Sequence, residues 1–200
     1  MSDTVPLVAF GVFAVANWLA VARQDKQLEY ITKPAALASL IIYGAIGTHA
    51  SGWLVTALAF SLLGDVYLML PVDLFAAGLG AFLLAHVAYV IDFDVAILTR
   101  LGWWLAVIAV SSPVAFRIVR SIEDRTLRAA TAVYMLVIAL MVASAVASGN
   151  RIAAAGAVLF MASDTVLAWN RFVRVLSWSH PVIMVTYHLG QLGLAYALRG

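Results

Sequence analysis

The chain has 200 residues, of which 64% are hydrophobic and 11% are charged. A soluble domain carries about 25% charged residues, so this composition indicates an integral membrane protein. Lys and Arg number 12 and Asp and Glu number 10, and no basic run is interleaved with aromatics, so we expect no nucleic-acid partner. The sequence has no cysteine, which excludes disulfides and thiolate metal sites.

The apolar segments predict an all-α, polytopic membrane protein with eight transmembrane helices, because roughly 17–25 apolar residues cross a bilayer as a helix. Short loops join the segments, so we expect one integral membrane domain over residues 1–200. No basic stretch precedes the first segment, which favours a retained helix over a cleaved signal. Proline suits a first helical turn, so Pro34 is expected to open the second segment. The predicted segments are 5–22, 34–50, 52–70, 74–91, 101–119, 126–147, 151–169 and 178–198.

The distribution of Lys and Arg predicts the orientation of these helices. Most of them fall in the loops after the first, fifth and seventh segments, whereas the other side has only Arg100, Arg151 and Arg199. The basic side is expected to be cytoplasmic, which places both termini on the non-cytoplasmic side of the cell membrane. Acidic residues near segment ends, such as Asp25 and Glu29, are interpreted as solvated.

Two aspartates lie inside apolar segments with similar surroundings. Asp65 is in FSLLGDVYLML of the third segment and Asp164 is in LFMASDTVLAW of the seventh, 99 positions later. Each comes late in its segment, on the order of 10 Å from the cytoplasmic boundary. A parallel four-plus-four repeat would produce this pattern. Because a membrane carboxylate is costly, both aspartates are candidate functional residues.

The segments after each aspartate contain further polar side chains. His86 and Tyr89 lie in the fourth, and Tyr187, His188 and Gln191 lie in the eighth. Tyr187 and Gln191 are four residues apart and should share a helix face. Either histidine alone would fit an ordinary interhelical hydrogen bond.

Several stretches resemble the YhhN family of bacterial membrane proteins, whose animal relatives are the TMEM86 lysoplasmalogenases. These are Thr32-Lys33-Pro34, GDVYLM from Gly64, HVAY from His86 and GAVLFMASDTVLA from Gly156, followed by Tyr187 and Gln191. The resemblance implies an eight-helix hydrolase that cleaves the vinyl ether bond of lysoplasmalogen. The products would be a fatty aldehyde and glycerophosphoethanolamine or glycerophosphocholine, and the partners a lysophospholipid substrate and membrane lipid.

Two carboxyl groups suit this reaction. A protonated carboxyl can protonate the alkene carbon distal to the ether oxygen, and a carboxylate can stabilise the oxocarbenium ion and activate water, as in glycosidases. We therefore expect Asp65 and Asp164 to be catalytic, without assigning which is the acid, and no metal or cofactor is required. Lys33 either snorkels to the interface or pairs with a lipid phosphate. The expected substrate-binding or orienting residues are Lys33, Tyr67, His86, Tyr89, Ser163, Tyr187 and Gln191.

Four other hypotheses fit parts of the pattern. An intramembrane aspartyl protease would need glycine where Leu62 stands. A zinc hydrolase would need clustered His and carboxylate ligands. A small-lipid or proton-coupled transporter also uses membrane carboxylates and internal repeats. Finally, the two aspartates could do no more than tie helices together.

Overall fold

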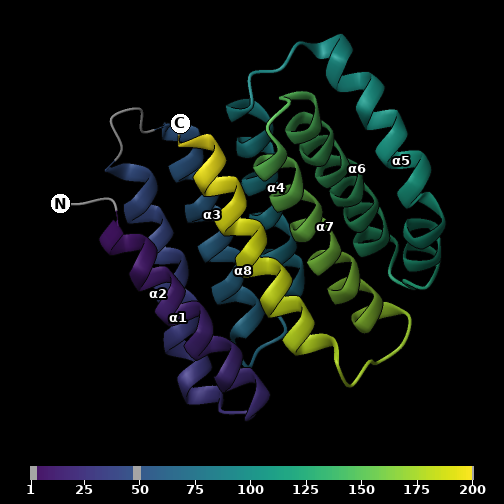
Figure 1. The fold of residues 1–200 in the computed structure, drawn as a ribbon. Coiled ribbons are helices and arrows are strands. Elements are labelled where there is room, and N and C mark those ends of the chain that lie inside the picture. The colour runs from purple at the N-terminus through teal and green to yellow at the C-terminus, as the bar shows by residue number, and fades with distance from the viewer. Residues whose placement is uncertain (1–3, 47–50, 200) are drawn as a thin grey trace. The chain divides into compact units, whose positions relative to one another are not determined.

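The chain folds into helices joined by short loops (Figure 1). This computed structural model describes residues 4–46 and 51–199, and within these ranges it has eight α-helices and no strand. The all-α prediction is therefore confirmed for this part of the chain. The helices are α1 (Thr4–Ala22), α2 (Lys26–Ala45), α3 (Gly52–Met69), α4 (Phe75–Asp92), α5 (Ile97–Arg120), α6 (Arg125–Ala147), α7 (Arg151–Phe172) and α8 (Ser179–Leu198).

Six of these helices are long and apolar enough to cross a membrane, namely α1, α3, α4, α5, α6 and α7. The protein is therefore a multi-pass membrane protein. The helices α2 and α8 are not among the six. In α2 the reason is visible in the sequence, because its first half carries Lys26, Glu29 and Lys33.

The second helix begins eight residues earlier than predicted, because a polar cap starts it. Asp25 accepts a hydrogen bond from the backbone N–H of Leu28 at 3.0 Å, as N-cap residues do. Pro34 consequently lies inside α2, so the expectation that proline opens this helix was wrong.

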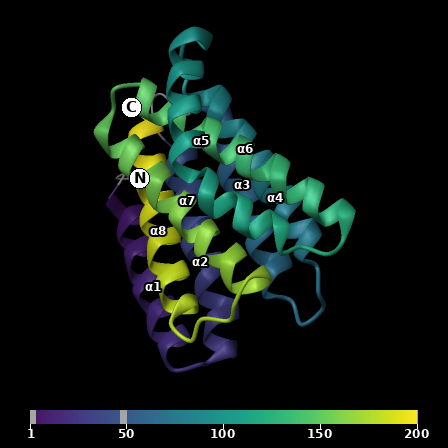
Figure 2. The same ribbon diagram turned by 90° about the vertical axis from the view of Figure 1, so that its right-hand side faces the viewer.

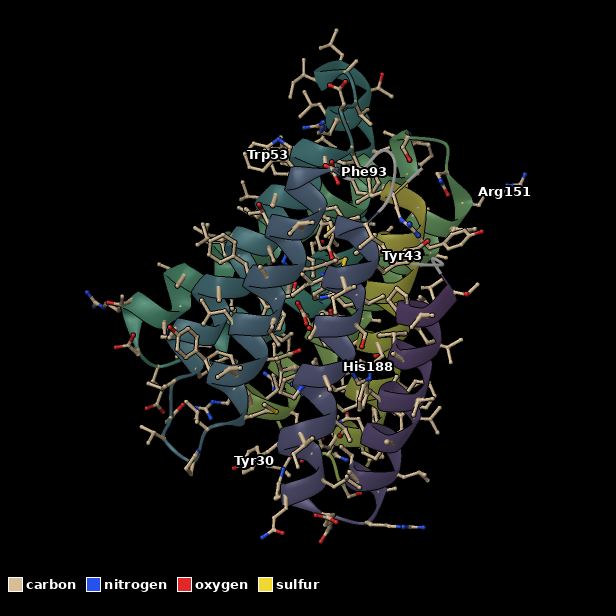
Figure 3. All side chains as sticks on the ribbon, turned by 90° about the vertical axis from the view of Figure 1, so that its left-hand side faces the viewer. Tyr30, Tyr43, Trp53, Phe93, Arg151 and His188 are labelled. Carbon is tan, nitrogen blue, oxygen red and sulfur yellow. The ribbon has the colours of Figure 1, made fainter. Side chains whose placement is uncertain are left out.

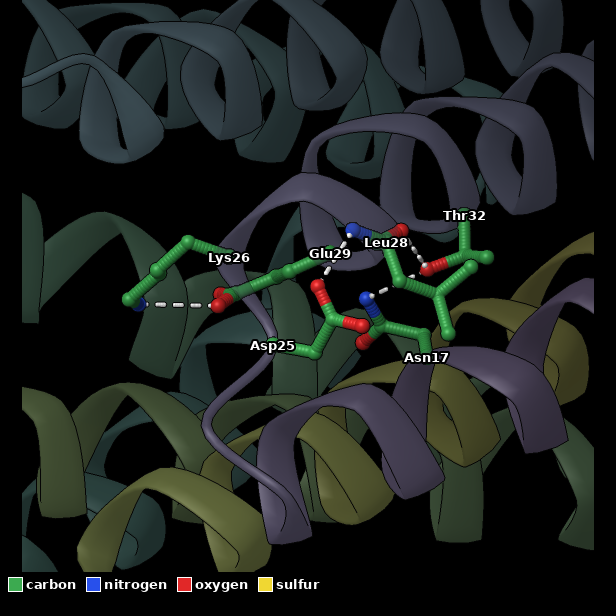
Figure 4. A network of polar contacts seen from close by, with 6 residues as sticks. All are labelled: Asn17, Asp25, Lys26, Leu28, Glu29 and Thr32. Carbon is green, nitrogen blue, oxygen red and sulfur yellow. Dashed lines mark hydrogen bonds and ion pairs between the residues drawn. The ribbon is translucent and has the colours of Figure 1, made fainter.

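The first turn of α2 also corrects the interpretation of its charges as solvated. Glu29 is only 5% exposed, and its carboxylate pairs with the Lys26 ammonium at 2.8 Å. Next to this pair, Asn17 of α1 donates to the Thr32 hydroxyl at 3.1 Å. Figure 4 shows this polar network at the junction of α1 and α2. Asp25 is exposed, as interpreted, and its carboxylate also caps the helix, so only Glu29 departs from the interpretation.

The chain divides into two compact units, each built mainly from four helices. The first comprises Met1–Asp92 and Ala195–Gly200, and the second comprises Phe93–Leu194. In the first unit, α1 packs on α2, α2 on α3 and α3 on α4. Along α2, Tyr30 and Tyr43 lie toward opposite ends of the helix (Figure 3), and the Arg199 guanidinium stacks 4.0 Å from the Tyr43 ring centroid.

Glycines bring α3 and α4 close together in the first unit. A Cβ atom on Gly64 would lie 2.6 Å from the Phe82 ring, and one on Gly78 would lie 2.7 Å from a Leu68 methyl group. Small residues allow such close approach in membrane bundles. Gly64 immediately precedes Asp65, so this contact fixes the helix face that carries the aspartate.

In the second unit, α5 and α6 run side by side (Figure 2), and both contact α7. The indole N–H of Trp104 on α5 donates to the Leu136 carbonyl on α6 at 3.0 Å. The helix α7 meets α8 through backbone contacts at glycines. A Cβ atom on Gly156 would lie 2.8 Å from the backbone nitrogen of Leu194, and one on Gly190 would lie 2.8 Å from that of Phe160.

Candidate functional site

Asp65 lies on the buried stripe of α3, in the first unit. This stripe follows helical spacing and consists of Leu54, Ala57, Leu58, Ser61, Gly64 and Asp65. The side chain is almost fully enclosed, because the residue is 1% exposed. The Lys33 ammonium of α2 lies 2.9 Å from Asp65 Oδ1. The two helices therefore place one cation and one carboxylate in direct contact inside the bundle.

This contact differs from both expectations for Lys33, which were snorkelling and pairing with a lipid phosphate. A snorkelling lysine would hold its ammonium at the interface, whereas the Lys33 residue is 5% exposed. The snorkelling alternative is therefore wrong. Two charges removed from water are tolerated only where their attraction offsets the desolvation. The ion pair thus gives the buried Asp65 carboxylate a cationic partner on the neighbouring helix.

The helix α4, which packs on α3, carries two other candidate residues of the first unit. His86 and Tyr89 are both fully buried, and they lie three residues apart on one face. His86 contacts the backbone carbonyl of Phe82 through Nδ1. Tyr67, a further candidate, is half-buried. It comes two residues after Asp65 and therefore points from a different side of α3.

Asp164 of α7 has a phenol partner in the second unit. The Tyr134 hydroxyl of α6 donates a hydrogen bond to Asp164 Oδ2. Tyr134 is buried, so the bond lies inside the protein. Sequence reasoning missed this tyrosine. A signal was present, because Thr131 and Tyr134 are polar residues three apart in an otherwise apolar stretch, and such a pair shares a helix face.

The remaining candidates of the second unit belong to the contact between α7 and α8. Ser163 donates to the Ile183 carbonyl at 3.1 Å, so its hydroxyl ties the two helices together. The Gln191 side-chain amide donates to the Tyr187 hydroxyl at 3.2 Å, which confirms that these two residues share a face. The Tyr187 ring also meets Phe160 edge-on at 5.3 Å.

His188 is fully buried, and its ring centroid lies 5.6 Å from that of Tyr187; Figure 3 labels it.

In the part of the chain that the structure describes, no group of three or more His, Asp or Glu residues is arranged to hold a metal ion. Each unit thus contains one of the two candidate aspartates with a defined polar partner, Lys33 for Asp65 and Tyr134 for Asp164. The pairing of the two aspartates with each other stays a prediction.

Comparison with known proteins gives consistent relatives. The human protein named lysoplasmalogenase TMEM86B is 37% identical over 137 residues, which are 68% of this chain and 58% of the human protein. The protein of the same name from Sus scrofa is 35% identical over 136 residues, 68% of this chain and 58% of its own length. That from Rattus norvegicus is 33% identical over 161 residues, 80% of this chain and 67% of its own length.

The chain thus spans less than two thirds of the human and pig relatives. No solved structure matches it. The YhhN family model matches residues 28–198, a range that includes both aspartates and every other candidate site residue. The chain belongs to the YhhN family.

Proposed function

We propose that this protein is a lysoplasmalogenase. It hydrolyses the vinyl ether bond of 1-alkenyl-glycerophosphoethanolamine or 1-alkenyl-glycerophosphocholine and releases a fatty aldehyde and the glycerophospho-alcohol. The observation that carries the proposal is the 37% identity, over 68% of the chain, to a human protein named lysoplasmalogenase. Two membrane carboxylates with different polar partners suit the chemistry of that reaction.

The proposed membrane arrangement has all eight helices crossing the cell membrane as one integral domain, 1–200. The helices α2 and α8 have 20 residues each, which makes each about 30 Å long and matches the hydrocarbon core of a bilayer. The division into two units of four helices supports a parallel four-plus-four repeat. Asp65 lies on the third helix of the first unit and Asp164 on the third helix of the second.

Both termini are proposed to be non-cytoplasmic, because the basic residues concentrate on the other side. The absence of native cysteine makes this easy to test by labelling single cysteines in intact cells. Ser121→Cys lies in the turn after α5 and Asn150→Cys precedes α7. We expect an impermeant maleimide to label Asn150→Cys and to spare Ser121→Cys. The reverse pattern would overturn the topology.

We propose that the catalytic roles divide according to the partners. Lys33 favours ionised Asp65, so Asp65 acts as the base that activates water and stabilises positive charge. Asp164 acts as the acid that protonates the alkene carbon distal to the ether oxygen. The Tyr134 hydroxyl holds one carboxyl oxygen of Asp164 and thereby orients the other oxygen for proton transfer. This division of labour is that of paired carboxyls in glycoside hydrolysis.

The other candidate residues are proposed to orient substrate and water. Tyr187 and Gln191, which are bonded to each other, present amide and phenol groups able to hold substrate oxygens. His86 and Tyr89 would act in the same way from α4. Asp65 lies four residues before the end of α3, about 6 Å along the helix axis. A vinyl ether just below the head group of a lysolipid in the cytoplasmic leaflet would lie at a similar depth.

The proposal is tested by measuring aldehyde release from an alkenyl-lysophosphatidylethanolamine by the purified full chain in detergent. Asp65→Asn and Asp164→Asn should each lower kcat on the order of 10²–10⁴-fold, the usual contribution of general acid–base catalysis. Asp94→Asn is the matched control, because Asp94 is exposed and has a φ of 43°, which asparagine tolerates.

Near-full activity in a well-folded Asp164→Asn protein would refute the catalytic assignment. A wild-type protein that moves the lysolipid across vesicles but releases no aldehyde would indicate the transporter alternative.

A further inference from the structure

Hydroxyl groups within the helices of this chain bond repeatedly to their own backbone. Many of them donate to the carbonyl four residues earlier, which is the common alternative to solvent for a helical serine or threonine. Ser61 departs from this pattern. Its Oγ is buried, with the residue 0% exposed, and has no hydrogen-bond partner in the described ranges. The hydroxyls that follow the pattern are those of Thr32, Ser39, Thr56, Ser111, Ser144, Thr165 and Thr186.

The position of Ser61 connects it with Asp65. The two residues are four apart on α3 and belong to the same buried stripe. Side chains at this spacing are neighbours, with Cβ atoms about 5–6 Å apart. A water molecule that bonds to both would need two hydrogen bonds of about 2.7–2.8 Å each, which fits this separation.

A second buried hydroxyl resembles that of Ser61, and it lies near the other candidate aspartate, Asp164. Thr131 of α6 is buried and its hydroxyl has no hydrogen-bond partner among the described residues. It lies one turn before Tyr134, the residue that donates to Asp164. The two hydroxyls without a partner therefore each lie one helical turn from a residue of the candidate site, Ser61 from Asp65 and Thr131 from Tyr134. Because a buried hydroxyl without a partner is disfavoured, their recurrence at these positions favours use by a ligand over accident.

We propose that Ser61 is a positioning residue that, together with Asp65, holds the water molecule consumed in vinyl ether hydrolysis. This inference rests on the proposed lysoplasmalogenase function. The water donates one hydrogen bond to the Asp65 carboxylate and the other to Ser61 Oγ. Its lone pair is then directed away from both groups and toward the substrate carbon. Lys33 holds the Asp65 carboxylate in place from α2.

The reaction then balances as follows. Asp164 gives its proton to the distal alkene carbon, which leaves an oxocarbenium ion at the carbon bonded to the ether oxygen. The water oxygen forms a bond to that carbon while Asp65 takes one water proton, and a hemiacetal results. The hemiacetal hydroxyl gives its proton to Asp164, the bond to the glycerol oxygen breaks, and that oxygen takes the proton held by Asp65, so both carboxyls return to their starting states. The sum is vinyl ether plus water giving aldehyde plus alcohol.

Competition between water and methanol tests the role of Ser61. Methanol that captures the oxocarbenium ion gives a mixed acetal that retains the glycerol oxygen, so the ratio of acetal to aldehyde reports which nucleophile was held. In Ser61→Ala we expect this ratio to rise about threefold to tenfold, the range that corresponds to the loss of one hydrogen bond. We expect kcat to fall by a similar factor, with KM nearly unchanged.

Ser144→Ala is the matched control, because Ser144 is equally buried but its hydroxyl bonds to the Leu140 carbonyl. This variant should keep the wild-type product ratio. Ser61→Cys distinguishes the loss of the hydrogen bond from the loss of side-chain volume, since a thiol fills a similar volume and is a weak acceptor. Both Ser61 variants should shift the product ratio in the same direction.

An unchanged ratio in Ser61→Ala would overturn the inference, and so would a shift in Ser61→Ala that Ser61→Cys does not share. In both cases wild-type aldehyde release would leave the proposed function standing. A wild type that releases no aldehyde would remove the proposed function, and the inference with it.

Discussion

The ion pair between Lys33 and Asp65 is the contact whose removal should be felt most strongly. Its charged atoms are 2.9 Å apart, so their attraction is about 6 kcal/mol at an effective dielectric constant of about 20. Much of this attraction offsets the desolvation of both groups, and the net value of the pair is small. Removing one partner is different, because it leaves the other charge buried. For Lys33→Met we expect the free energy of unfolding to fall by about 3–5 kcal/mol.

The double variant Lys33→Met/Asp65→Asn tests whether the two side chains stabilise the protein as a pair or independently of each other. With both charges gone, no uncompensated charge stays buried, and stability should return to within about 1 kcal/mol of wild type. The free energies come from unfolding in detergent micelles titrated with denaturant, for wild type, both single variants and the double variant. Activity should not return in the double variant, because the Asp65 carboxylate is absent.

A double variant whose loss of stability equals the sum of the losses in the two single variants would show that the two effects do not depend on each other. That result would refute the buried pair as the reason for the loss. Equal stability of Lys33→Met and wild type would refute it as well, since the energy assigned to the isolated carboxylate would be missing. Lys33→Arg serves as the control, because it keeps the charge while changing the shape of the donor.

Two further predictions concern the second unit. Tyr134→Phe removes the phenol donor of Asp164 and should lower kcat by roughly tenfold, as expected for a hydrogen bond worth about 1.5 kcal/mol to a charged or charge-developing group; unchanged kinetics would exclude a role for this bond. Gly156→Ala places a Cβ atom 2.8 Å from the backbone nitrogen of Leu194 and should destabilise the protein by about 1–3 kcal/mol. Gly11→Ala, which has nothing within 4 Å of the added atom, should leave the midpoint of detergent unfolding unchanged or raise it.

Much of the fold could be predicted from the sequence because membrane helices are continuous apolar segments. The bounds predicted for the first, third, fourth, sixth and eighth helices agree with the structure within one residue. The start of the second helix was predicted too late because its first two turns are polar. Hydropathy assigns polar residues to loops, even where they form a helical turn that is buried against a neighbouring helix. Glu29 and Lys33 lie in those turns and are both enclosed.

The sequence was enough to identify most candidate site residues, but not the side chains that pair with the two aspartates. Asp65 and Asp164 stand out because carboxylates are rare in apolar segments. That Tyr187 and Gln191 share a helix face follows from their spacing alone, and the hydrogen bond between them confirms it. Tyr134 was missed because its bond to Asp164 joins residues 30 positions apart on different helices. The spacing of Thr131 and Tyr134 marks a polar helix face, but periodicity within one segment does not identify Asp164 as the partner.

The sequence predicts two similar carboxylates, and the structure gives them different partners. Asp65 meets an ammonium group, which favours a fixed negative charge. Asp164 meets a phenol hydroxyl, which donates to a carboxyl in either protonation state. A repeat with identical partners would give two groups with the same proton affinity, and acid–base chemistry needs two that differ. The difference between the partners Lys33 and Tyr134 is therefore the feature that would let two aspartates in similar sequence surroundings act as base and acid.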